Sequence, residues 1–78
     1  MKAFEDLKFT PHLMGDGIHA TMYLKNGNMI SVIQTPCSYG GRVGLYELAV
    51  IDPSGAFLDV QGYLKESNVV DIINELEK

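Results

Sequence analysis

The chain has 78 residues, of which 46% are hydrophobic and 21% charged, with four tyrosines and three phenylalanines. This length and composition predict one globular domain over residues 1–78 and exclude a disordered chain. Ten acidic against six basic residues give a net charge of −4, and Arg42 is the only arginine. Nucleic-acid binding through a basic surface is therefore disfavoured.

The cysteine content and the N-terminal sequence both predict a cytoplasmic location. Cys37 is the only cysteine, so disulfides are excluded as a stabilising element, and a lone cysteine is typical of a reducing cytosol. The first residues contain no apolar stretch of the length a signal peptide needs, and no segment approaches the roughly 20 apolar residues of a membrane span. We expect a cytoplasmic protein that does not enter a membrane.

The first third of the chain predicts extended structure. Residues 3–7 are compatible with one helical turn or with an extended chain, and residues 8–13, which include Pro11, predict a short edge strand. Gly15-Asp16-Gly17 predicts a turn. Residues 18–24 then alternate in polarity, as a half-buried strand does, with one face formed by Ile18, Ala20, Met22 and Leu24.

Asn26-Gly27 predicts a hairpin between residues 18–24 and 29–35, because this dipeptide is preferred in two-residue type I′ turns. Such a turn places Leu24 opposite Met29, Tyr23 opposite Ile30, Thr21 opposite Val32 and Ala20 opposite Ile33. Both faces of the sheet are then partly apolar. One face must bind the helix. The other, with Tyr23, Ile30 and Val32, requires the N-terminal segment, a partner or a second copy, and we expect function on that face.

The middle of the chain predicts a loop over residues 36–44, which contain three glycines, and a strand over 45–51. Asp52-Pro53-Ser54-Gly55 predicts a type I turn. Residues 56–60 predict the last strand, and Gly62 is expected to let the chain leave the sheet.

The C-terminal segment changes to a helical period, with apolar residues at Val69, Ile72, Ile73 and Leu76. Its N-cap is predicted at Ser67 or near Lys65. The predicted fold is α+β: a four- to five-stranded antiparallel sheet, a meander with an Asn-Gly hairpin, packed by one C-terminal amphipathic helix.

Several segments resemble the short hypothetical proteins encoded by bacteriophages and prophages. The resemblance extends over nearly the whole chain and rests on Pro11-His12, Gly15-Asp16-Gly17-Ile18, Asn26-Gly27, Ser38-Tyr39-Gly40-Gly41, Gly44-Leu45-Tyr46-Glu47-Leu48-Ala49-Val50 and Gly62-Tyr63-Leu64. It departs at Lys65-Glu66-Ser67-Asn68, where the usual acidic first helical turn is absent. The resemblance implies an accessory protein that binds a host or phage protein, including components of defence systems, and it implies no catalytic residue.

Two groups of residues have the chemistry of a catalytic or metal site. His12, Asp16 and His19 are potential ligands or acid-base groups, but their spacing matches no standard motif. We interpret Asp16 as a turn residue and the histidines as strand ends. Cys37 would act as a nucleophile only with a histidine in contact, and no catalytic signature surrounds it, so we expect no enzyme, no metal and no cofactor.

The glycine-rich loop supports two further readings. Gly40, Gly41 and Arg42 offer backbone amides and a guanidinium for an anion, which gives small-ligand or nucleotide binding as the alternative function. Tyrosine and arginine are enriched in protein interfaces, and the loop region provides Ser38, Tyr39, Arg42 and Tyr46. The leading hypothesis is a non-enzymatic phage-type protein that binds a host or phage macromolecule through these four residues of the loop region and the neighbouring sheet edge. Its expected role is host takeover or inhibition of a defence system, and homodimerisation through an edge strand is compatible with it.

Overall fold

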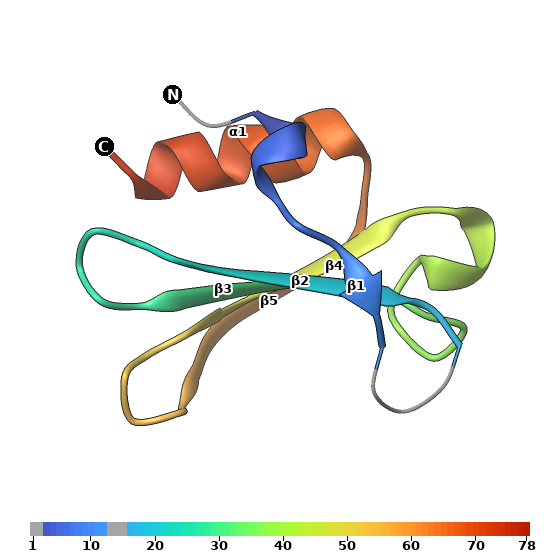
Figure 1. Ribbon diagram of the computed structural model, residues 1–78, viewed down its shortest axis with the longest axis horizontal. Coiled ribbons are helices and arrows are strands. Elements are labelled where there is room, and N and C mark those ends of the chain that lie inside the picture. The colour runs from blue at the N-terminus through green and yellow to red at the C-terminus, as the bar shows by residue number, and fades with distance from the viewer. Residues whose placement is uncertain (1–2, 13–15) are drawn as a thin grey trace.

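The computed structural model describes residues 3–12 and 16–78, and its five strands form one antiparallel sheet in the order β1-β2-β3-β4-β5. The helix α1 and the 3-10 turn η1 both lie on the same side of this sheet (Figure 1). The predicted α+β fold is confirmed. The elements are η1 (Phe4–Asp6), β1 (Thr10–Pro11), β2 (Ile18–Tyr23), β3 (Met29–Gln34), η2 (Gly41–Val43), β4 (Tyr46–Ile51), β5 (Phe57–Leu64) and α1 (Glu66–Leu76).

The predicted edge strand over residues 8–13 is formed by Thr10 and Pro11, which pair with β2 at the margin of the sheet. Leu13 and Gly15 lie outside the described residues. Gly17 takes a φ of 110°, which fits the turn predicted there, and the His12 amide donates to the Gly17 carbonyl at 3.0 Å.

The β2–β3 hairpin is present, but its predicted register is wrong by one residue. Tyr23, not Leu24, lies opposite Met29. A type I′ turn needs a positive φ at both central residues, whereas in this turn only Gly27 has one, at 92°. The turn therefore contains three residues, 25–27, instead of two. The Leu24 amide donates to the Asn28 carbonyl across it at 2.7 Å.

The shift of register decides which side chains form the core. Ile30 lies opposite Met22, and Val32 lies opposite Ala20, so both point toward α1 rather than sharing a face with Tyr23 as predicted. The largest fully buried side chains are Ile30, Val32, Leu48, Val69 and Ile73. Alternation along β2 and β3 thus gives one buried face and one face that is half-buried on β3 and partly exposed on β2.

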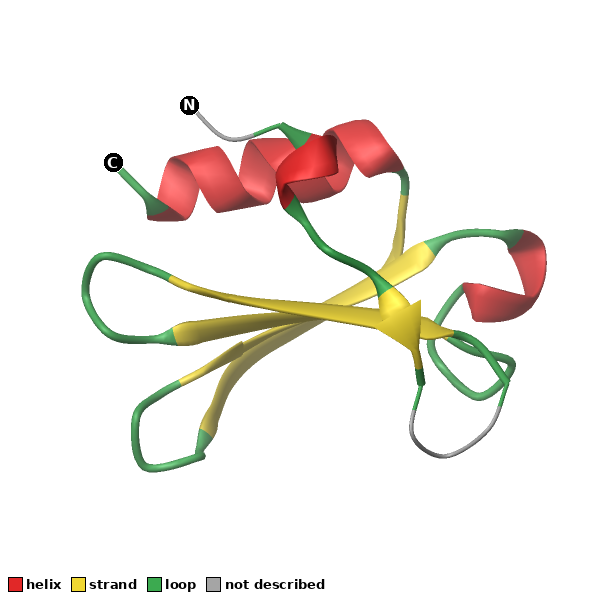
Figure 2. Ribbon diagram, viewed as in Figure 1, coloured by secondary structure: helices red, strands yellow, loops and turns green. Residues whose placement is uncertain are grey.

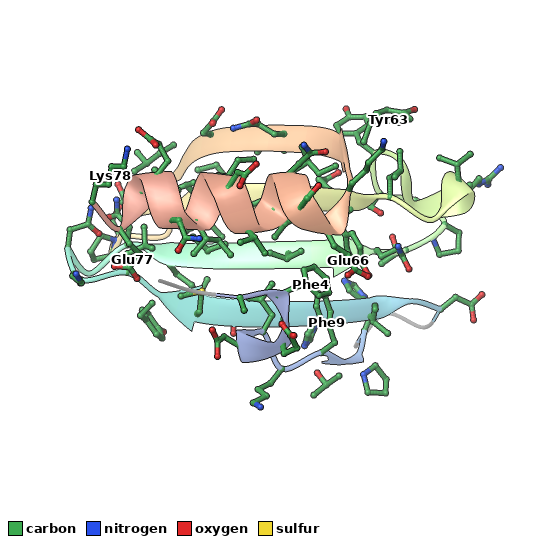
Figure 3. The ribbon with its side chains drawn as sticks, turned by 90° about the horizontal axis from the view of Figure 1, so that it is seen from above. Phe4, Phe9, Tyr63, Glu66, Glu77 and Lys78 are labelled. Atoms are coloured by element: carbon green, nitrogen blue, oxygen red, sulfur yellow. The ribbon has the colours of Figure 1, made fainter. Side chains whose placement is uncertain are left out.

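The N-terminal segment packs on the helix side of the sheet. Phe4 in η1 lies 5.4 Å from Phe9 and 5.2 Å from Tyr46 between ring centroids, and Leu7 is buried in the core. Figure 3 shows Phe4 and Phe9 together near Glu66, at the start of α1. Burial, and then the neighbouring Glu66 carboxylate, raise the pKa of Tyr46 above its ordinary value. The helical turn over residues 3–7 is therefore formed, and this segment does not cover the second face.

The predicted turn at Asp52–Gly55 is confirmed by the Gly55 amide, which donates to the Asp52 carbonyl at 2.9 Å. The Asp52 carboxylate accepts the Ser54 hydroxyl at 2.6 Å and the Ala56 amide at 2.9 Å. These hydrogen bonds, that of the Ser54 hydroxyl above all, lower the pKa of Asp52 below its ordinary value.

Strand β5 continues to Leu64, four residues beyond its predicted end. Gly62 does not turn the chain off the sheet as predicted. A Cβ at Gly62 would overlap the Cβ of Tyr39, so glycine is required there by close packing. The bulge falls beside it, where Tyr63 takes a φ of 56°.

Helix α1 begins at Glu66 with Lys65 as its N-cap, so the alternative start at Ser67 is wrong. The Asn68 side-chain oxygen accepts the Lys65 amide at 3.0 Å. Val69 and Ile73 are buried, as the periodicity predicts, whereas Leu76 is 39% exposed. In the described part of the chain, no helix combines the length and apolarity needed to cross a bilayer.

The buried helix face gives a test of the core. Ile73→Ala leaves a cavity under α1 and is expected to lower the free energy of unfolding by about 2–5 kcal/mol, measured by urea denaturation. The matched control is Leu76→Ala on the same helix, which should cost less than half as much because its side chain is already partly in solvent. Equal losses for the two variants would contradict the placement of α1.

The β4–β5 turn gives a test of electrostatics. Ser54→Ala removes the main stabiliser of the Asp52 carboxylate, so the pKa of Asp52 should rise toward its ordinary value in a ¹³C carboxyl titration. The stability that this carboxylate contributes is present above its unfolded-state pKa, about 3.9, and is lost as pH falls through its lower folded-state pKa. Ser31→Ala, which is remote from the turn, serves as the control, and an unchanged Asp52 titration in Ser54→Ala would refute the assignment.

Candidate functional site

The face of the sheet opposite α1 carries a row of apolar side chains that crosses four strands. Tyr23 lies opposite Met29, Met29 opposite Ile51, and Ile51 opposite Phe57. A second row runs from Ser31 through Ala49 to Val60. Because opposite residues share a face, these rows lie on one surface, which we call the open face: Tyr23, Met29, Ser31, Ala49, Ile51, Phe57 and Val60. Ala49, at its centre, is buried by its neighbours.

The open face exposes large apolar side chains to solvent. Tyr23 is 73% exposed, Phe57 66% and Val60 42%. Scattered exposed apolar residues are ordinary, but an apolar patch that is continuous over several strands marks an interaction surface. Figure 2 shows why this face is open to solvent: α1 and η1 lie together on the opposite side of the sheet.

One end of the open face is polar. Thr10 and His19 are joined by a 3.0 Å hydrogen bond, and the register continues from His19 through Ile33 to Glu47. The Glu47 carboxylate accepts the Tyr39 amide at 2.9 Å. The glycine-rich loop is thereby attached to this end of the sheet.

The loop over residues 36–44 is held by its own hydrogen bonds. The Ser38 hydroxyl accepts the Thr35 amide and donates to the Thr35 carbonyl, both at 2.9 Å. A Cβ at Gly41 would overlap the Thr35 carbonyl, and Gly40 takes a left-handed φ of 89°. These glycines therefore have a structural role that any loop of this shape requires.

The structure separates the four residues predicted to bind a partner. Tyr39 is exposed and lies at the border of the open face, against Gly62, while Ser38 is engaged in its turn. Arg42 is exposed, and its Nε donates to the Pro36 carbonyl at 3.0 Å. Tyr46 packs with the phenylalanines on the helix side, so it does not share a surface with Tyr39.

The geometry at Gly40, Gly41 and Arg42 does not favour a ligand. The amides of Gly41, Val43 and Gly44 donate to carbonyls of the loop itself. The cavity beside Gly40 and Arg42 measures about 110 Å³, whereas sites for small ligands usually have about 300–1,000 Å³.

The residues with metal-ligand or acid-base side chains lie partly close together. His12, Asp16 and Cys37 line a cavity of about 250 Å³, and the His12 and His19 rings lie 5.6 Å apart in an edge-on arrangement. Among residues 3–12 and 16–78, no three side chains of the metal-binding types form a cluster that would hold an ion.

The sequence predicts an uncovered functional face that includes Tyr23, but it assigns Ile30 and Val32 to that face wrongly and misses most of its other residues. Phe57 and Val60 were assigned to a strand but not to a site, and Met29 and Ile51 were interpreted only as strand residues. The pattern that could have indicated this surface is Ala56-Phe57-Leu58-Asp59-Val60. Asp59 indicates that the strand is partly in solvent, yet its neighbours are large and apolar. Identifying the surface also required the correct hairpin register.

Comparisons of the chain with protein-family models, with curated proteins and with solved structures find no match.

Proposed function

We propose that this chain is a non-enzymatic binding protein whose open face docks on an apolar surface of another protein. The observation that carries the proposal is the row from Tyr23 to Phe57, which α1 and η1 leave uncovered because both pack on the other side; Tyr23 and Phe57 are exposed, and Met29 and Ile51 between them are half-buried. Aromatic residues supply the largest buried area in protein interfaces at small entropic cost. The exposed Tyr39 extends this surface at its border.

The resemblance to short bacteriophage and prophage proteins supports the same proposal. Under it, the partner is a host or phage protein in the host cytoplasm, and the proposed role is host takeover or inhibition of a defence component. A net charge of −4 and a single arginine favour a protein partner over a nucleic acid.

The test compares substitutions on the two sides of the sheet. Tagged wild-type chain and the variants Tyr23→Ser, Phe57→Ser and Glu75→Ala are used to capture proteins from cells, and the enriched protein is then purified and titrated calorimetrically. We expect each open-face substitution to weaken binding at least tenfold, about 1.4 kcal/mol, while Glu75→Ala on the exposed side of α1 binds like wild type.

Two outcomes contradict the proposal. If the open-face variants bind like wild type while Tyr39→Ala or Arg42→Ala abolishes binding, the loop is the site and the open face is not. If Glu75→Ala alone weakens binding, the partner docks on the helix. Melting curves of all variants confirm that they remain folded.

A further inference from the structure

The helix side of the sheet is not covered over its whole width. Neighbouring strands lie about 4.8 Å apart, so the five strands extend over about 19 Å, whereas a helix with its side chains is about 10 Å wide. The buried side chains of the sheet come from β2, β3 and β4, and no residue of β5 is buried. In Figure 3, β5 runs along one margin of the molecule beside α1, with the N-terminal turn on the other side of the helix. The helix side of β5 is therefore left without a covering element.

Two polar side chains of β5 lie on this uncovered part of the sheet. Asp59 is opposite Val50 and Gln61 is opposite Leu48, and both of these β4 residues belong to the core under α1. Because opposite residues share a face, Asp59 and Gln61 lie on the helix side, where both are exposed. The Gln61 side chain donates to the Asp59 carboxylate at 3.0 Å. β5 therefore presents a polar and acidic surface beside the helix.

A groove of about 390 Å³ lies between α1 and β5. Gln61 lines it from β5. From α1 it is lined by two rows, one apolar with Ile72 and Leu76, and one acidic with Asp71 and Glu75. The members of each row are four residues apart, which is about one helical turn, or 6 Å along the axis. The groove is therefore both apolar and acidic, and both properties repeat with the period of a helix.

The acidic row is poorly balanced within the helix itself. No lysine or arginine stands three or four residues from Asp71, and Glu75, four positions on, is a like charge. Like charges at this spacing destabilise a helix, and a carboxylate in the last turn also opposes the helix dipole. Glu75 pairs with Lys78 at 3.1 Å, but the two side chains are 71% and 74% exposed, and such a surface pair contributes little. A cationic ligand would relieve both unfavourable interactions.

The form of the ligand follows from the strand beside the groove. The pairing of β5 with β4 is interrupted by two register shifts, and the Tyr63 amide donates to the Tyr39 carbonyl at 3.2 Å. An extended peptide added to this edge would therefore find few regular hydrogen-bond partners. A helix laid in the groove needs no edge hydrogen bonds, and its turns repeat at the same interval as Asp71 and Glu75. Its width of about 10 Å also fits the uncovered part of the sheet.

We infer that the groove between α1 and β5 binds a basic amphipathic helix of another protein. The apolar residues of this helix pack on Ile72 and Leu76. Its lysines or arginines, four residues apart, pair with Asp71 and Glu75, and a cation on its other flank reaches Asp59. The contact is small, so the complex is weak and reversible. The inference does not depend on the open face, which lies on the other side of the sheet.

A peptide titration followed by fluorescence anisotropy tests the ligand. The probe is a labelled synthetic helix of leucine and lysine, about 18 residues long so that it is helical alone, with its leucines along one face. We expect it to bind the wild-type chain with an affinity that falls as salt is added, while the same peptide with glutamate in place of lysine does not bind. Absence of binding by the lysine peptide, or equal binding of the two peptides, overturns the inference.

Matched variants test the position of the site. Asp71→Asn and Leu76→Ser are each expected to weaken binding of the lysine peptide about fivefold. Glu5→Gln removes the same charge as Asp71→Asn but from η1, where Glu5 is exposed on the other side of α1, and it should bind like wild type. Equal losses in Asp71→Asn and Glu5→Gln would show general attraction to an acidic protein and would refute the groove. Tyr23→Ser should keep peptide binding and lose the open-face partner, so failure of this inference is distinguishable from failure of the proposed function.

Discussion

An eleven-residue helix is about 16 Å long, and a helix of this size covers one face of a small sheet and no more. The remaining apolar segment, around Phe4 and Phe9, packs beside Tyr46 on the face that α1 already occupies. Because both covering elements are on one side, the strands must expose their alternate residues on the other. The open face follows from this single limit.

Local chemistry predicted the order and type of the elements well. The alternation over residues 18–24, the Asp52–Gly55 turn and the helical period at Val69 and Ile73 each depend on near neighbours in the chain, and each is found in the structure. The wrong register at Asn26-Gly27 arose because that dipeptide fits two turn geometries. A shift of one residue then moved Ile30 and Val32 from the exposed face to the core.

Features that depend on distant contacts were not accessible from the sequence. Gly62 signals a chain reversal when considered alone, but its role is to accept the side chain of Tyr39, which lies more than twenty positions earlier. The side on which residues 3–7 pack is likewise set by a tertiary contact with Tyr46. The candidate site differs from the predicted loop for the same reason. The loop residues are hydrogen-bonded to one another, and the neighbouring sheet carries the exposed aromatic rings.

The central claim is that the two faces of the sheet differ in their exposure to solvent. Paramagnetic relaxation by a soluble gadolinium chelate measures this difference directly for side-chain protons. We expect strong relaxation at the Tyr23 and Phe57 rings, and almost none at the methyl groups of Ile30 and Val32, which are fully buried. Equal protection of the two sets would show that something covers the open face and would contradict the account.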